Sequence, residues 1–204
     1  MKVNKVKQAL KEGRAVLGTM VTEFRTPEIA RMMAAAGFDF IFIDTEHSAY
    51  TTETVTDIIR AGKAVDLVCL VRVPDAEYHL MARTLDIGAQ GLMIPRVETV
   101  ETVERIIQAT KYPPWGERGF GARAIITDYE RMETGDLMKW LNENTMIVLQ
   151  IERKKAIEAI DKLVSVRGVD AALIGPNDLS ISLGVPGQLD HPLMVEAIQK
   201  VVDA

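Results

Sequence analysis

Short apolar runs alternate with longer segments of helical periodicity along the whole chain. The short runs are apolar at consecutive positions, as expected of parallel strands that are covered on both faces. The longer segments repeat their apolar residues at the spacing of amphipathic helices. This alternation predicts βαβ units and a parallel sheet. We predict strands at residues 15–19, 38–44, 67–73, 91–95, 146–152 and 171–175, and helices at 27–36, 52–64, 76–85, 97–110, 127–142, 154–163 and 177–183.

Local signals mark several boundaries of these elements. Pro27 suits the first turn of the first predicted helix, with Thr26 as its N-cap, and Gly37 suits its C-terminal end. Residues 112–121 interrupt the alternation with two prolines and three glycines. We expect an ordered loop there, and long ordered loops are often functional.

Polar residues follow the ends of the predicted strands, where the active site of a (β/α)8 barrel forms. They are Asp44, Glu46, His47, Arg72, Glu152, Asn177 and Asp178. The first predicted turn, residues 18–23, lacks the glycine-rich fingerprint of a doubly wound sheet, so we favour the barrel. Only six strands are predicted, and residues 192–204 resemble a helix still under way. We therefore expect a single barrel domain over residues 1–204 that covers about six of eight βα units and is truncated at its C-terminus.

Composition limits the class of protein. Charged residues make up 26% and hydrophobic residues 48%, as in ordinary globular domains. The net charge of −5 argues against a nucleic-acid partner. The single cysteine, Cys69, lies in an apolar run and is expected to be a buried hydrophobe. The N-terminus lacks an apolar signal core and no run is long enough to cross a membrane, so we expect a cytoplasmic protein.

Glu152 and Asp178 stand at the ends of consecutive predicted strands and can converge on one cation. Hard oxygen ligands of this kind suit Mg²⁺, Mn²⁺ or a similar ion, with substrate and water in the remaining positions. A zinc site made of protein ligands would need more His or Cys than this chain has. The alternative is that both carboxylates cap the helices that follow them.

His47 and Arg72 add a base and a cation at the same end of the predicted sheet. His47 can move a proton at neutral pH, or it can hydrogen-bond to its own loop. Arg72 ends an apolar strand, so it needs an anionic partner, which is either a substrate carboxylate or an internal carboxylate such as Asp44 or Glu46. Together with a metal these groups predict enolate chemistry on a 2-oxo acid. No lysine stands at a strand end to form a Schiff base.

Six stretches in order along the chain resemble the HpcH/HpaI aldolase family. They are FDFIFIDTEH at 38–47, VRVP at 71–74, LDIGAQGLMIP at 85–95, YPPWGERG at 112–119, QIE at 150–152 and IGPNDLS at 174–180. The resemblance is to the metal-dependent class II pyruvate aldolases, such as those acting on 4-hydroxy-2-oxoheptanedioate or 2-dehydro-3-deoxyglucarate. It implies a TIM barrel of the phosphoenolpyruvate/pyruvate type and reversible cleavage of a 4-hydroxy-2-oxo acid to pyruvate and an aldehyde, through a metal-stabilised enolpyruvate.

The resemblance also implies roles for individual residues. Glu152 and Asp178 would bind Mg²⁺, Mn²⁺ or Co²⁺, Arg72 would grip the pyruvyl group, and His47 would help to activate the water or alcohol that carries the proton. Asp86 would reach the active site of a neighbouring subunit and pair with its His47, in a hexamer built as a trimer of dimers.

Around the substrate carboxylate the resemblance places the backbone of Gly175, Asn177 and Asp178, with Gln150 in the same pocket. Pro176 has no N–H, so Asn177 and Asp178 would be the donors. Three alternatives stay open: a CoA-ester lyase or an oxaloacetate decarboxylase on the same scaffold, or a non-catalytic barrel subunit.

Overall fold

The structure is a computed structural model that describes residues 1–121 and 124–204. Its six strands form one curled parallel sheet in which each strand pairs with the next along the chain, so that β1 and β6 lie at the two edges. This partial (β/α) barrel confirms the predicted fold class. The strands are β1 (Gly18–Val21), β2 (Phe40–Asp44), β3 (Val68–Arg72), β4 (Gly91–Ile94), β5 (Met146–Ile151) and β6 (Ala171–Ile174).

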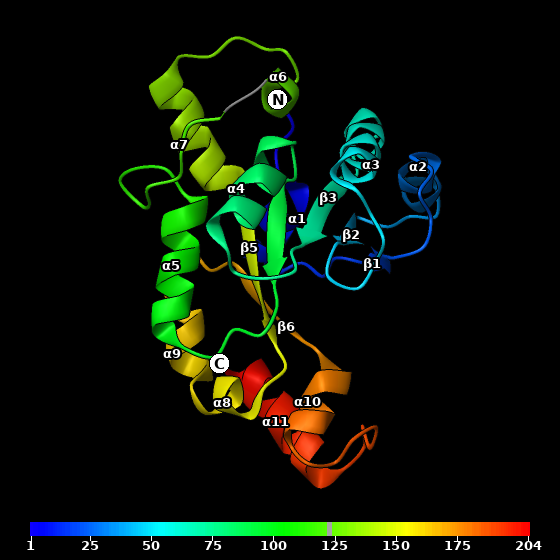
Figure 1. The fold of residues 1–204 in the computed structure, drawn as a ribbon, viewed down its shortest axis with the longest axis vertical. Coiled ribbons are helices and arrows are strands. Elements are labelled where there is room, and N and C mark those ends of the chain that lie inside the picture. The colour runs from blue at the N-terminus through cyan, green and yellow to red at the C-terminus, as the bar shows by residue number, and fades with distance from the viewer. Residues whose placement is uncertain (122–123) are drawn as a thin grey trace.

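Helices surround the sheet, and those from α8 to α11 gather at the lower end of the molecule in Figure 1. Threonine N-caps begin two of the long helices: Thr51 accepts from the N–H of Thr54, and Thr99 from that of Thr102. The helices are α1 (Lys5–Lys11), α2 (Glu28–Ala35), α3 (Thr52–Ala64), α4 (Tyr78–Asp86), α5 (Val100–Thr110), α6 (Ala124–Thr127), α7 (Thr134–Asn144), α8 (Lys154–Glu158), α9 (Ile160–Val164), α10 (Pro176–Ser182) and α11 (Pro192–Asp203).

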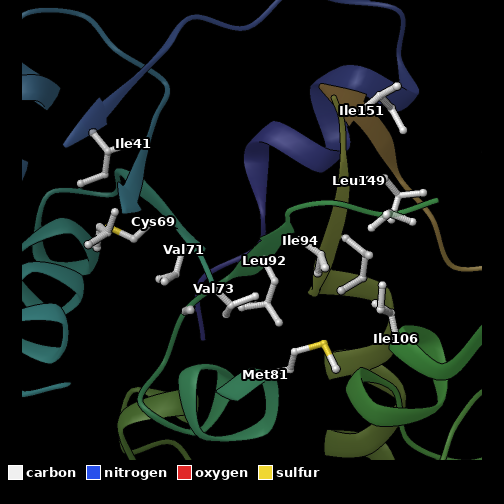
Figure 2. Close-up of a cluster of buried hydrophobic side chains, with 14 of the residues drawn as sticks. Ile41, Cys69, Val71, Val73, Met81, Leu92, Ile94, Ile106, Leu149 and Ile151 are labelled. Carbon is white, nitrogen blue, oxygen red and sulfur yellow. The ribbon is translucent and has the colours of Figure 1, made fainter. Parts of the chain in front are cut away.

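The outer face of the sheet packs against the helices. Alternate strand residues such as Ile41, Val71 and Leu149 point outward and are fully buried. They share one apolar cluster with Met81 of α4 and Ile106 of α5, as Figure 2 shows. Burial of this layer is the main contribution to holding the helices on the sheet.

The inner face of the sheet carries a second apolar cluster. Phe42, Leu70, Met93 and Val148 point into the barrel and are buried. Val6 of α1 packs against the same cluster, so α1 covers the N-terminal end of the strands. The two faces therefore alternate strictly along each strand, which decides where the residues at the strand ends point.

The N-terminal part of the chain differs from prediction in two places. The first strand covers residues 18–21 instead of 15–19. Its first residue, Gly18, leaves space for the ring of Phe40, which would lie 2.1 Å from a Cβ atom at position 18. Helix α1 was not predicted; Asn4 caps it and also donates to the backbone oxygen of Gln90. By contrast, Gly37 ends α2 with a φ of +90°, as predicted.

Two predicted helices differ from the structure. The helix predicted at 127–142 begins only at Thr134, as α7, while α6 ends at Thr127, because Asp128 and Tyr129 adopt positive φ angles of 53° and 64°. The helix predicted at 154–163 is interrupted at Ala159, between α8 and α9. The predicted loop at 112–121 is ordered: its Gly119 N–H, for example, donates to the Tyr78 hydroxyl at 3.0 Å.

Within the described residues, no helix is both long and apolar enough to cross a membrane.

Candidate active site

Three polar side chains extend the inner face of the sheet at its carboxyl end. Asp44, Arg72 and Gln150 each lie two residues beyond an inward-facing apolar residue of their own strand. They therefore point into the mouth of the barrel, above the apolar cluster. The β2–β3 register places Asp44 directly beside Arg72.

Asp44 and Arg72 form a bidentate ion pair. Nε of Arg72 donates to Oδ1 of Asp44 at 2.8 Å, and Nη2 donates to Oδ2 at 2.7 Å. Burial raises the pKa of the Asp44 carboxyl, but the hydrogen bonds from Arg72 and from the backbone N–H groups of Glu46 and His47, together with the charge of Arg72, lower that pKa by more. The side-chain bonds to Asp44 also raise the pKa of Arg72. Asp44 is thus the internal partner of Arg72 that the sequence left open. Among the described residues, Nη1 of Arg72 donates only to Oε1 of Gln150, at 3.5 Å.

Glu46 lies among three cationic or titratable side chains. Its carboxylate is 3.4 Å from Nε of Arg72, 3.6 Å from Nη2 of Arg96 and 3.8 Å from Nε2 of His47. Its side chain is 9% exposed, and burial raises its pKa. Oε2 is buried and has no hydrogen-bond partner among residues 1–121 and 124–204. His47 itself is 66% exposed, so its imidazole projects from the mouth toward solvent.

The Glu152 carboxylate is held from two sides. Oε1 accepts from the backbone N–H of Arg96 at 2.7 Å, and Oε2 accepts from Nε2 of Gln150. Gly175 packs against it so closely that a Cβ atom would lie 2.7 Å from Oε2. Glu152 is only 3% exposed and does not cap α8, whose N-cap is Arg153. The helix-cap reading of Glu152 is therefore not supported.

Asp178 and Asn177 lie in the first turn of α10. Gly175 is the N-cap of this helix and Pro176 its first residue. Both Asp178 and Asn177 are exposed, and helix geometry leaves their N–H groups without partners inside the helix. A carboxylate in the first turn is also favourable for the helix, so a capping contribution of Asp178 stays open.

The donor set predicted from the sequence, Glu152 and Asp178, would suit a divalent cation that is shared with other ligands. Among residues 1–121 and 124–204, no three His, Cys, Asp or Glu side chains are grouped so that they alone could hold a metal. Two carboxylates would leave several positions of an octahedral ion to substrate and water. Gly175, the N-cap of α10, brings the start of this helix directly against the Glu152 carboxylate. Oxygen donors of this kind match Mg²⁺, Mn²⁺ or Co²⁺.

Asp86 lies apart from these residues, in the last turn of α4. Its Oδ1 accepts from Nη2 of the buried Arg118 at 2.6 Å, and the Arg118 guanidinium stacks over Tyr112. Gly121 permits this arrangement, because a Cβ there would lie 2.6 Å from Asp86 Oδ2. Within the described part of one chain, Asp86 thus pairs with Arg118 and not with His47. Its role in a neighbouring subunit stays a prediction.

Sequence reasoning missed Arg96, which stands at the carboxyl end of β4 and contacts both Glu46 and Glu152. The sequence contained a signal for Arg96, because it is a charged residue directly after a buried strand and a proline. Arg72 was selected because it ends a buried strand, and the same criterion applies to Arg96. The orphaned oxygen of Glu46 could not be foreseen, since it depends on packing among three strand ends.

Comparison with known proteins agrees with the fold. The sequence model of the HpcH/HpaI aldolase/citrate lyase family matches residues 20–204. The chain belongs to that family. Among curated members, a 2-keto-3-deoxy-L-rhamnonate aldolase from Escherichia coli K12 is 33% identical over 201 residues, which cover 98% of this chain and 73% of that relative.

Solved structures of the family are also similar. The HpcH/HpaI aldolase from Desulfitobacterium hafniense DCB-2 superposes with a TM-score of 0.93 at 40% identity, covering 97% of this chain and 76% of the other. The citrate synthase SbnG superposes with a TM-score of 0.87 at 33% identity, with the same coverage of 97% and 76%.

Proposed function

We propose that the chain catalyses reversible cleavage of a 4-hydroxy-2-oxo acid of the 2-keto-3-deoxy class to pyruvate and an aldehyde. The observation that carries the proposal is the grouping of Arg72, Gln150 and Glu152 at the barrel mouth. Membership of the HpcH/HpaI family supports it, as does the similarity to a 2-keto-3-deoxy-L-rhamnonate aldolase.

Glu152 and Asp178 would hold the divalent cation, Mg²⁺, Mn²⁺ or Co²⁺, which when bound supplies Lewis-acid polarisation of the 2-oxo group. The chain then has to orient the substrate carboxylate. The first-turn N–H groups of Asn177 and Asp178 suit an anion. Gly175 brings this turn close to Gln150, because a Cβ there would lie 3.1 Å from Nε2 of Gln150. These four residues form the proposed substrate-binding set together with Arg72.

Arg72 would stabilise the negative charge that develops during cleavage. Its Nε and Nη2 atoms are fixed by Asp44, so the guanidinium is already oriented and Nη1 is directed toward Gln150. A preorganised donor of this kind requires little rearrangement in the transition state. The C4 hydroxyl gives up its proton, the electron pair of the C3–C4 bond passes to the three-carbon fragment, and C3 then takes up a proton to give pyruvate.

His47 would carry the proton, directly or through water, because its imidazole is exposed at the mouth beside Glu46. We further propose that Asp86 of a neighbouring subunit supports His47, which requires an oligomer; the hexamer follows from the family resemblance. A cytoplasmic location is part of the same proposal and agrees with the buried free thiol of Cys69.

The test is pyruvate release, followed with a coupled dehydrogenase, over a panel of 4-hydroxy-2-oxo and 2-keto-3-deoxy acids. We expect activity with Mg²⁺, Mn²⁺ or Co²⁺ and its loss after exhaustive chelation. His47→Ala should lower turnover, while His79→Ala is the matched control, because His79 is an exposed histidine on α4. Full activity of the chelated protein would rule out the proposed reaction mechanism.

Oxaloacetate decarboxylation is the second candidate, since its product is the same enolate of pyruvate. The similarity to a citrate synthase shows that the scaffold is not restricted to sugar-acid cleavage. Including oxaloacetate in the panel separates the two: decarboxylation without cleavage of any hydroxy-oxo acid would favour the second candidate.

A further inference from the structure

Arg96 has an unusual backbone conformation for its position. It follows β4 and Pro95 directly and has a φ of 55°, in the left-handed region. Side chains other than glycine, and to a lesser extent asparagine and aspartate, are disfavoured there. Among the described residues, the other non-glycine residues with positive φ are Asp66, Asp128 and Tyr129, and none of these three follows the carboxyl end of a strand. The conformation at Arg96 therefore needs an explanation specific to the barrel mouth.

The conformation directs the backbone N–H of Arg96 at Glu152. The N–H donates to Oε1 at 2.7 Å, while Nε2 of Gln150 donates to Oε2. These two donors approach the carboxylate from different strands, β4 and β5. A 3% exposed carboxylate held in this way has little freedom to turn.

The side chain of Arg96 does not explain the conformation by burial, since it is 46% exposed. Its Nη2 donates to the backbone oxygen of Pro74 at 2.5 Å and lies 3.6 Å from Oε1 of Glu46. These contacts tie the guanidinium to the loops after β2 and β3, at the rim of the mouth. The direct link to Glu152 thus runs through the main chain of Arg96 and not through its charge.

We propose that Arg96 is a positioning residue whose left-handed main chain orients the Glu152 carboxylate for a divalent cation. The inference rests on the proposed function, because it takes Glu152 as a ligand of that cation. A merely structural role or a purely electrostatic role of Arg96 would predict a different pattern of cation affinities among variants. The affinity for the cation should depend on how well residue 96 tolerates a positive φ, and not on the presence of a guanidinium.

The test is a series of variants that all lack the guanidinium: Arg96→Gly, Arg96→Asn, Arg96→Ala and Arg96→Val. Mn²⁺ affinity is measured by the paramagnetic resonance signal of the free ion during titration, with thermal unfolding recorded in parallel. We expect Arg96→Gly and Arg96→Asn to bind Mn²⁺ within about twofold of the unchanged protein. Arg96→Val should bind about tenfold more weakly and Arg96→Ala between these limits, because β-branched residues tolerate positive φ least.

The outcomes separate the two levels of the proposal. If the unchanged protein does not bind Mn²⁺, the proposed metal site itself fails and the inference with it. If the unchanged protein binds but all four variants lose affinity equally, the guanidinium is responsible and the inference alone is overturned. Equal affinity across the series, with only thermal stability reduced, overturns it too. Should Arg96→Val not fold, the comparison of Arg96→Asn with Arg96→Ala still decides.

Discussion

At the N-terminal end of the sheet, buried polar side chains bond to the backbone of the fold, whereas at the carboxyl end they bond mainly to one another. Lys7 donates to the Thr145 backbone oxygen at 3.0 Å and pairs with Asp170 at 2.9 Å. Lys111, which is fully buried, donates to the backbone oxygens of Asn142 and Thr145. These bonds join α1, α5, α7 and the segment before β6 under the barrel.

The mouth is arranged differently. Arg72 is shared between two carboxylates, and Oε2 of Glu46 lies 3.4 Å from Nε of Arg72 without a hydrogen bond to any described residue. Arg96 holds a disfavoured conformation. Such features destabilise a fold unless another group compensates for them. This difference predicts that the N-terminal cluster (Lys7, Lys111 and Asp170) serves stability and that the mouth cluster (Glu46, Arg72 and Glu152) serves binding and chemistry. Substitutions at each end can test this.

The largest expected effect is on activity, from Glu152→Gln at the mouth. The amide keeps the size of the side chain but removes the charge that a divalent cation needs. We expect Mn²⁺ binding to be lost and pyruvate release to fall by at least about 10²–10³-fold. The free energy of unfolding should change by less than about 1 kcal/mol, because the amide oxygen can still accept from the Arg96 N–H and Gln150 can turn its own amide so that its oxygen accepts from the new NH2 group. If Glu152→Gln lost activity only because it unfolds, stability and chemistry would not be separated between the two ends of the sheet.

Asp170→Ala should have the opposite effect, with a loss of stability and no loss of kcat. It leaves Lys7 buried without its carboxylate and removes the acceptor of the Ile147 N–H. We expect unfolding in urea to show a loss of about 3 kcal/mol, with kcat of the folded protein unchanged. Asp161→Ala, which removes an exposed aspartate on α9, is the control and should be close to neutral. If Asp170→Ala kept normal stability but had a reduced kcat, the N-terminal cluster would also serve the reaction.

Much of this fold could be predicted because parallel strands buried on both faces must be continuously apolar. All six strands were found, with ends displaced by up to three residues. Helix α1 was not found, because its stability depends on covering a barrel that a local pattern does not reveal. The break after α6 was missed because two residues with positive φ, Asp128 and Tyr129, carry no glycine signal.

At the site, the strand-end rule selected Arg72 and Glu152, because parallel strands in a barrel bring all their carboxyl ends together. Their contacts were less predictable: the sequence left open whether Arg72 pairs internally, and the structure pairs it with Asp44. The Arg96–Glu152 bond joins positions 56 residues apart through a backbone angle that no sequence pattern indicated. A role for Asp86 across subunits lies beyond anything that a single chain can show.

The smallest expected effect is the change of the unfolding free energy with pH that Lys111 causes at the N-terminal end of the sheet. Burial, with the nearby charge of Lys7, lowers the pKa of Lys111 from 10.5 to about 7. Between these two values the unfolded chain binds more protons than the folded one, so the free energy of unfolding should rise with pH. Below about pH 7 both states carry the proton, and the destabilisation by the buried ammonium is complete.

Lys111→Met removes this dependence. Between pH 7 and pH 9, the unchanged protein should gain about 2 kcal/mol of unfolding free energy relative to Lys111→Met in urea denaturation. Lys139→Met removes an exposed lysine of α7 and should leave the slope as it is. Parallel pH profiles for the unchanged protein and Lys111→Met would mean that the carbonyls of Asn142 and Thr145 solvate the ammonium as well as water does. The N-terminal cluster would then stabilise the fold at every pH, because its hydrogen bonds to the backbone compensate fully for the buried charge.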